Sequence, residues 1–136
     1  MDWKVKNQKN KAVVWNYWQR MNSAKPHEVK GICKKAFDRN INWNGSQPFN
    51  QIRGIDELVT IFWEPLLNSF PDIERVPHIL LGGLSDGEEW VSGYGYLTGT
   101  FVHDWLGIPA TGKKTHINFG QFFVMRDEKI VESYVI

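Results

Sequence analysis

The spacing of apolar residues changes from helical to strand-like about halfway along the chain. In the first half these residues recur every three or four positions, which is typical of one buried face of an α-helix. In the second half they form runs separated by turn signals, which predict antiparallel strands. Helices followed by an antiparallel sheet predict an α+β fold, in which the helices cover one face of the sheet.

Three helices are predicted in the first half, within residues 10–23, 26–37 and 56–70. Pro65 lies inside the third helix, and we expect a kink there because proline removes a backbone hydrogen-bond donor. The segment between the second and third helices is rich in Asn, Gly and Pro. It is predicted to be a loop with one short strand near residues 41–43.

The strands of the second half are predicted to join at turns over residues 85–87 and 127–128, with a loop over residues 104–114. Gly93 and Gly95 lie on one face of the second predicted strand. Glycine on one face allows a sheet to bend sharply. We therefore expect a curved sheet that forms a cone with the helices and encloses a cavity.

The composition is that of one domain spanning residues 1–136. Lys and Arg number 16 and Asp and Glu number 15, so no basic field favours nucleic acid as a partner. No apolar run approaches the roughly 20 residues of a membrane span, and no secretory signal is recognised. We expect a soluble, cytoplasmic protein without a nucleic-acid or membrane partner.

Aromatic residues are unusually frequent, with seven Trp, four Tyr and eight Phe in 136 residues. Such side chains bury large areas and often line small-molecule pockets. A filled core explains any single ring equally well, but this number in a small domain favours a cavity.

Strand alternation places Trp90, Tyr94 and Tyr96 together on the face opposite Gly93 and Gly95. We predict that this polar and aromatic face contributes to the cavity. The alternative is that it forms a dimer surface or faces solvent.

The last hairpin supplies a candidate acid–base group. Counting back from its turn predicts three facing pairs: Met125 with Ile130, Phe123 with Glu132, and Gln121 with Tyr134. A desolvated carboxylate near aromatic rings has a raised pKa that suits a general acid or base. The alternative for this glutamate is an exposed charge at the sheet edge.

Other catalytic chemistry finds little support in the sequence. The four histidines lack the spacing of metal ligands, so no metal site is expected. His103 and Asp104 are adjacent and could pair only in a loop. Cys33, the single cysteine, falls on the apolar face of a predicted helix, and no nucleophile motif is present.

The segment Gly107–Lys114, GIPATGKK, resembles the GIPPTGR loop of the SnoaL-like polyketide cyclases, a family of the nuclear-transport-factor-2-like superfamily. Further stretches agree with that family in order and spacing, and the resemblance covers nearly the whole chain. These stretches are Trp43-Asn44-Gly45 with Pro48 and Asn50, Phe62–Leu66, Phe70–Asp72, Gly99-Thr100 and Lys129–Glu132.

The resemblance implies a curved-sheet cone covered by three helices, a homodimer, and one deep pocket in each subunit. Family members with a known activity close a polyketide ring by an intramolecular aldol step, without a cofactor or a metal. They act through an acid–base Asp and a supporting His. Their pocket must fold a flexible substrate, remove a proton beside a carbonyl and stabilise the enolate.

The sequence departs from the family pattern at these two residues. The supporting His falls near Phe123, and Tyr134 occupies the aromatic position that precedes the Asp, which the sequence as given does not reach. Glu128 replaces a usual glycine in the last turn. A left-handed backbone there would cost about 1 kcal/mol.

The leading hypothesis is an acid–base cyclase or isomerase for an apolar or polycyclic molecule. Glu132 is the candidate base, and Tyr96 and Tyr134 are the candidate hydroxyl donors to an enolate oxygen. The residues predicted to bind the substrate are Trp18, Trp43, Trp90, Tyr94, Phe119, Gln121 and Phe123. The alternative is a non-catalytic ligand-binding or dimerisation domain, which a pocket without a carboxylate or histidine would favour. A protein–protein module that uses the open sheet face is the third hypothesis.

Overall fold

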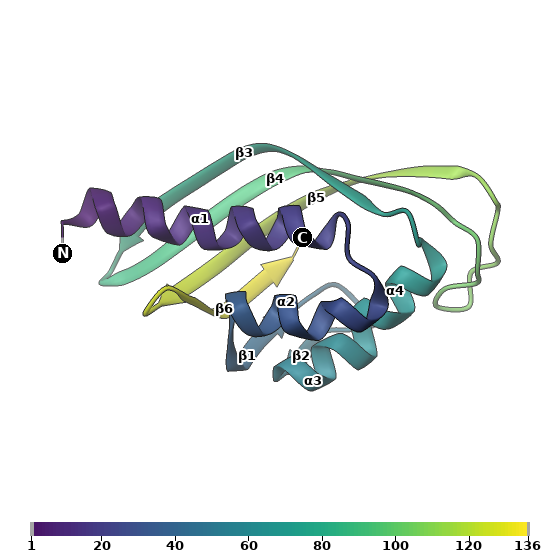
Figure 1. Cartoon of the computed structure of the whole chain (residues 1–136), viewed down its shortest axis with the longest axis horizontal. Helices are drawn as coiled ribbons and strands as arrows, with labels where there is room; N and C mark the ends of the chain where they lie inside the picture. Colours follow the sequence, from purple (N-terminus) through teal and green to yellow (C-terminus); the bar gives the residue numbers. More distant parts are fainter. Residues whose placement is uncertain (1, 136) are drawn as a thin grey trace.

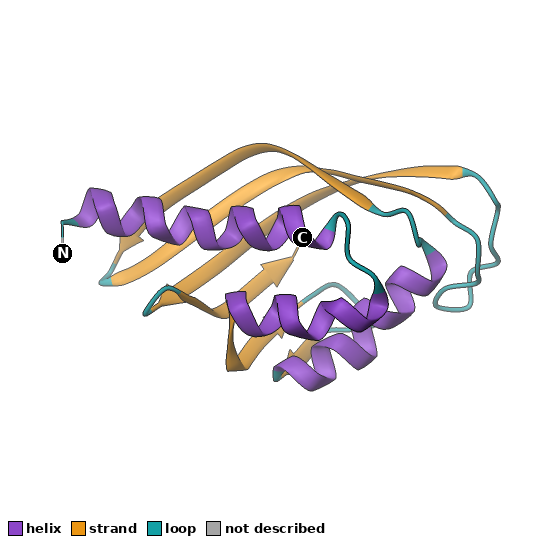
Figure 2. Ribbon diagram, in the orientation of Figure 1, coloured by secondary structure: helices purple, strands orange, loops and turns teal. Residues whose placement is uncertain are grey.

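Six strands form one curved sheet, and the helices lie against one of its faces in the computed structural model, which describes residues 2–135 (Figures 1 and 2). The helical elements are α1 (Trp3–Met21), η1 (Pro26–Glu28), α2 (Val29–Ala36), α3 (Ile55–Glu57), η2 (Leu58–Trp63) and α4 (Glu64–Ser69). The strands are β1 (Phe37–Asn44), β2 (Gln51–Arg53), β3 (Glu74–Ser85), β4 (Glu88–Thr100), β5 (Lys114–Arg126) and β6 (Lys129–Val135). The predicted α+β fold is confirmed.

The sheet runs in the order β2-β1-β6-β5-β4-β3. Its pairs are antiparallel except for β1 and β6, which run parallel. Helix α1 lies along β3 and β4, whereas α2 and α3 lie near β1 and β2 (Figure 1). The apolar face of α1, with Val14, Trp18 and Met21, is buried against the sheet as its spacing predicted. None of the helices within residues 2–135 is long and apolar enough to cross a membrane.

The predicted third helix is divided into three segments, and its middle segment, η2, is a π-helix. Pro65 lies just after η2, in the first turn of α4. Proline lacks the N–H that an α-helix needs at this point, and the wider π-turn accommodates the loss. The expected disturbance at Pro65 is therefore a change of helix type in the preceding turn.

Two glycines allow β4 to lie close to helix α1 and to strand β3. A methyl group at Gly93 would lie 2.6 Å from the Trp18 ring and 2.8 Å from the carbonyl oxygen of Ile79. A methyl group at Gly95 would lie 2.8 Å from the Cα of Pro77. Only glycine fits at both positions, so the bend of the sheet depends on them.

Both predicted hairpin turns are present. Asp86 and Gly87 have positive φ angles of 49° and 78°, and Asp127 and Glu128 have φ angles of 51° and 60°. Two successive positive φ angles are typical of two-residue hairpin loops, whose twist matches that of the strands. Glu128 therefore occupies the left-handed conformation that glycine adopts without cost.

The predicted register of the last hairpin is correct at the turn and wrong beyond it. Met125 pairs with Ile130, but a β-bulge follows and Val124 pairs with Glu132. The extra residue, Val131, shifts the rest of β6 by one position, which turns its side chains to the other face. Phe123 therefore faces Ser133, and Glu132 does not share its face.

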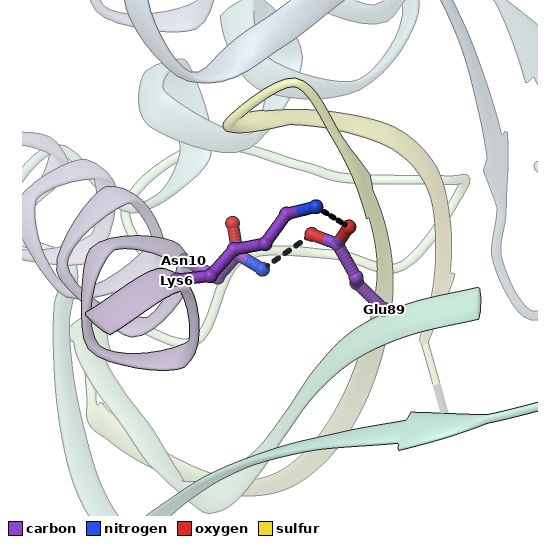
Figure 3. A network of polar contacts seen from close by, with 3 residues as sticks. All are labelled: Lys6, Asn10 and Glu89. Carbon is purple, nitrogen blue, oxygen red and sulfur yellow. Dashed lines mark hydrogen bonds and ion pairs between the residues drawn. The ribbon is translucent and has the colours of Figure 1, made fainter. Parts of the chain in front are cut away.

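A polar contact ties the start of α1 to the start of β4 (Figure 3). The Glu89 carboxylate accepts a hydrogen bond of 2.9 Å from the Asn10 amide. It also forms an ion pair with the Lys6 ammonium group, at 2.6 Å. Burial raises the pKa of the Glu89 carboxyl, but the bonds from Lys6 and Asn10 outweigh it and the pKa lies below its ordinary value. The ionised carboxylate thus stabilises the contact between helix and sheet.

We predict that Glu89→Gln destabilises the protein at neutral pH and has little effect in acid. The stabilisation is complete above the ordinary glutamate pKa of 4.5 and is lost as the pH falls through the lower folded value. The expected loss is roughly 1 kcal/mol at pH 7, measured by urea unfolding across a pH series. Glu88→Gln, at the exposed neighbouring position, is the control. An equal effect of Glu89→Gln at every pH would contradict this account.

Candidate functional site

An apolar cavity of about 310 Å³ lies between the helices and the inner face of the sheet. Its walls come from the β1–β2 loop, from η2 and α4, from the ends of β4 and β5, and from the loop between those two strands. The lining residues are Trp43, Ser46, Gln47, Phe49, Phe62, Leu66, Phe70, Ile73, Leu97, Thr98, Gly99, Trp105, Leu106, Thr115, Ile117, Asn118, Phe119 and Val135.

A cluster of aromatic rings forms one wall of the cavity. Trp43 lies 4.6 Å from Phe62 and 6.1 Å from Phe49 between ring centroids, and the two phenylalanines lie 5.2 Å apart. Trp105 continues the wall at 6.0 Å from Phe49. Tilted and edge-on pairs at these distances are mutually stabilising, so the rings hold the wall in place.

The loop between β4 and β5 closes one end of the cavity. Leu106 and Gly107 have φ angles of 54° and 77°, and Trp105 and Ile108 pair through their backbones. The carboxylate of Asp104 accepts a hydrogen bond of 2.8 Å from the Ala110 N–H. Asp104 therefore shapes the loop that carries Trp105 into the cavity wall.

A smaller recess of about 50 Å³ continues the cavity inward. It shares most of its walls with the cavity, including Trp43, Phe62, Leu97 and Phe119, and it adds Trp63, Arg75 and Gln121. The inner end of an otherwise apolar pocket is therefore polar.

Arg75 occupies this recess without a charged partner. Its guanidinium centre lies 4.3 Å from the Phe119 ring centroid and 5.1 Å from that of Trp18. It donates a hydrogen bond of 3.1 Å to Gln121, whose amide donates one of 3.1 Å to Ser133. Within residues 2–135, no carboxylate lies within ion-pair distance of Arg75.

The backbone of Arg75 is fixed by the end of α1. The Asn22 side chain accepts a 2.7 Å bond from the Arg75 N–H and donates a 3.0 Å bond to its carbonyl oxygen. Arg75 pairs with Leu97 across β3 and β4, so both side chains point to the inner face. Burial lowers the pKa of Arg75 to about 10, which leaves it charged at neutral pH.

The structure brings together only part of the predicted substrate-binding set. Trp43 and Phe119 line the cavity, and Gln121 lies in the recess. Trp18 and Phe123 lie in the packed core, 6.0 Å apart between ring centroids and fully buried. These five residues share the interior, and three of them, Phe119, Gln121 and Phe123, alternate along the inner face of β5.

Trp90, Tyr94 and Tyr96 do share one face of β4, but it is the outer face. Tyr94 is 51% exposed, and none of the three lines the cavity. The prediction that this face contributes to the cavity is wrong. The glycine face is the inner one, because its missing side chains make room for Trp18.

The candidate base and its neighbour also lie away from the cavity. Because of the bulge, Glu132 and Tyr134 pair with Val124 and Phe122 and not with the inward-facing residues. The Tyr134 hydroxyl donates a 2.7 Å bond to Glu132, and this bond raises the pKa of Tyr134. The structure therefore places Glu132 outside the cavity, half-buried on a central strand and not at the sheet edge.

Several lining residues were not singled out from the sequence. Phe49, Phe62 and Trp105 come from a loop, a helix and a second loop, so no single periodic pattern connects them. Arg75 precedes the runs from which strands were predicted, so its place on β3 and on the inner face is known from the structure alone. A charged residue in such a position usually has a specific partner.

The cavity lining sets limits on the chemistry of this site. The described lining is aromatic and aliphatic with a few amide and hydroxyl groups, and it includes no carboxylate or imidazole among residues 2–135. Such a surface binds apolar molecules and orients them through few polar contacts.

Comparisons with known proteins agree with this architecture. A SnoaL-like protein from Jannaschia sp. CCS1 has a TM-score of 0.81 at 18% identity, covering 96% of this chain and 85% of its own. AclR from Streptomyces galilaeus has a TM-score of 0.75 at 19% identity, with 96% and 89% covered. IdmH from Streptomyces antibioticus has a TM-score of 0.75 at 16% identity, with 93% and 90% covered.

These likenesses, at low identity, show a shared nuclear-transport-factor-2-like fold. No curated protein sequence matches the chain. The sequence profile of the SnoaL-like polyketide cyclases matches residues 13–136, nearly the whole length. The chain therefore belongs to the SnoaL-like polyketide cyclase family.

Proposed function

We propose that this protein binds an apolar, polycyclic small molecule in the cavity between its helices and sheet. The observation that carries the proposal is the cavity itself, whose aromatic wall is formed by residues such as Trp43, Phe49 and Phe62. Its volume of about 310 Å³ falls within the range of small-molecule sites. Flat rings fit a wall of this kind through stacked and edge-on contacts.

Of the leading hypothesis, an acid–base enzyme, and its alternative, a ligand-binding domain, the lining favours the second. Transfer of a proton from carbon requires a base within hydrogen-bond reach of the substrate. The candidate base, Glu132, lies on the outer face, and the described lining offers aromatic, aliphatic, amide and hydroxyl groups. Ring closure in the same cavity is the second candidate, supported by family membership and by an enclosed site that can hold a flexible chain folded.

We predict that filling the cavity weakens binding of a neutral aromatic probe. Ile117 lines the cavity yet is 44% exposed, so Ile117→Trp adds volume there without overpacking the core. N-phenyl-1-naphthylamine fluoresces in apolar surroundings and carries no charge at neutral pH. Its affinity should fall by about tenfold or more in this variant, since the ring and the new indole compete for one space.

Phe122→Trp is the matched control, because Phe122 lies on the outer face of the same strand. The control should bind the probe as the wild type does. A loss of binding in Phe122→Trp alone, or no loss in either variant, would contradict binding in the cavity.

The outer face of the sheet is our candidate for the contact between two subunits. It exposes apolar side chains from β3, β4, β5 and β6, with Leu81 57% and Tyr94 51% accessible. Trp90 stacks on Phe122 with 5.4 Å between ring centroids, so the two rings form a joined apolar patch on this surface. An exposed apolar face of this kind commonly mediates protein association, and the family resemblance favours a second copy of the chain.

We predict a homodimer, with a mass near twice 15.8 kDa in light scattering. Leu81→Glu should shift the protein toward the monomer, because each copy would place a charge in the contact. A wild type that stays monomeric at high concentration, or a Leu81→Glu variant that stays dimeric, would contradict an interface on this face.

A further inference from the structure

We infer that Arg75, together with Gln121, forms a binding site for an anionic oxygen group, either a carboxylate or an ionised enol, at the inner end of the cavity. The ligand is therefore an apolar ring system that carries one acidic group. This inference rests on the proposed function, because the group is delivered by a ligand whose rings fill the cavity. It adds a chemical class to that ligand.

The first argument is the unbalanced charge of Arg75. Moving a cation out of water is costly, and folded proteins normally compensate with a carboxylate. Here the compensation comes from the rings of Trp18 and Phe119 and from one hydrogen bond to Gln121. A neutral acceptor and two π faces replace only part of the lost hydration, so the site has a remaining attraction for an anion.

The second argument is geometric. A guanidinium group has five N–H donors in a planar fork, and Gln121 is its side-chain hydrogen-bond partner within residues 2–135. The recess beside it measures about 50 Å³, and a cavity with roughly 10–15 Å³ of probe volume already holds one water, so a small polar group fits. Donors are thus available next to a space of the required size.

The third argument is orientation. The recess opens into the larger cavity through walls that they share, including Phe62, Leu97 and Phe119. A molecule with its rings in the cavity therefore directs one end toward Arg75. The Gln121 amide uses one N–H for Ser133 and has a second, which can donate to the same anionic group.

The charge of Arg75 persists under physiological conditions. Burial lowers its pKa only to about 10, so the guanidinium remains protonated at neutral pH. The Asn22 side chain holds its backbone from both sides. The cation is therefore permanent and fixed before a ligand arrives, which reduces the ordering cost of binding.

The test compares three ligands of nearly equal shape by calorimetry at neutral pH: 2-naphthoate, 2-naphthol and 2-naphthamide. The carboxylate should bind about tenfold or more tightly than the neutral amide, as expected for a charge pair in a desolvated site. Bound naphthol should ionise at lower pH than free naphthol, which its absorption spectrum reports. If only 2-naphthoate gains affinity over the amide, the acidic group of the ligand is a carboxylate. If only the ionisation of bound 2-naphthol is seen, the group is an enol.

Arg75→Met should remove the preference for the anion and leave the affinity for 2-naphthamide within about twofold. The melting temperature of the ligand-free variant should not fall, because methionine fills the space without an unpaired charge. Arg75→Lys should retain part of the preference, since it keeps the charge but not the fork. Arg126→Met, which removes an exposed cation from β5, should bind as the wild type does.

Two results would separate the failure of this inference from failure of the proposed function. If 2-naphthoate and 2-naphthamide bind with equal affinity and bound 2-naphthol stays un-ionised, the anion site is overturned. The cavity then remains a binding site for apolar ligands. If calorimetry detects no binding of any of the three ligands, both the anion site and the proposed ligand-binding function are overturned. An equal loss of every ligand in Arg75→Met, together with a lower melting temperature, would assign Arg75 a purely structural role.

Discussion

The approach of Trp18 to the glycine face of β4 is the contact on which the rest of the structure depends. A methyl group at Gly93 would lie 2.6 Å from that indole, so the helix can lie this close only where the strand has no side chain. The indole then forms the floor beneath Arg75 and packs against Phe119 and Phe123. Helix α1 packs on β3 and β4, and none of its residues is among those that line the cavity.

The interior shows a conflict between stability and function at one residue. An apolar side chain at position 75 would pack against Trp18 and Phe119 at no electrostatic cost, whereas the arginine must lose much of its hydration. Positions that break the local rules of stability often belong to functional sites. Asn22 accepts one hydrogen bond from the Arg75 backbone and donates another to it, which holds the residue that gives the apolar cavity a polar end.

The sequence was sufficient for the fold and for most elements, because helix stripes, turn pairs and glycine positions each have a local cause. It missed β2 and most of β1, which lie in the segment predicted to be a loop with one short strand. It was insufficient for the side of the sheet that each residue faces. One bulged residue, Val131, reversed the faces of Glu132 and Tyr134, and this bulge lacks the glycine that marks some bulges in a sequence. The inner face of β4 was missed for another reason. A face of glycines has no apolar side chains to mark it as buried, and its burial becomes clear only once Trp18 of α1 is placed against it. Phe119 and Gln121 were found because their strand is regular.

The most direct test of the account is a crystal structure of the protein with 2-naphthoate. It predicts the rings between Phe62 and Leu97 and the carboxylate within hydrogen-bond distance of the Arg75 guanidinium group. A naphthoate bound on the outer face against Tyr94, with the interior filled by rearranged side chains, would contradict it.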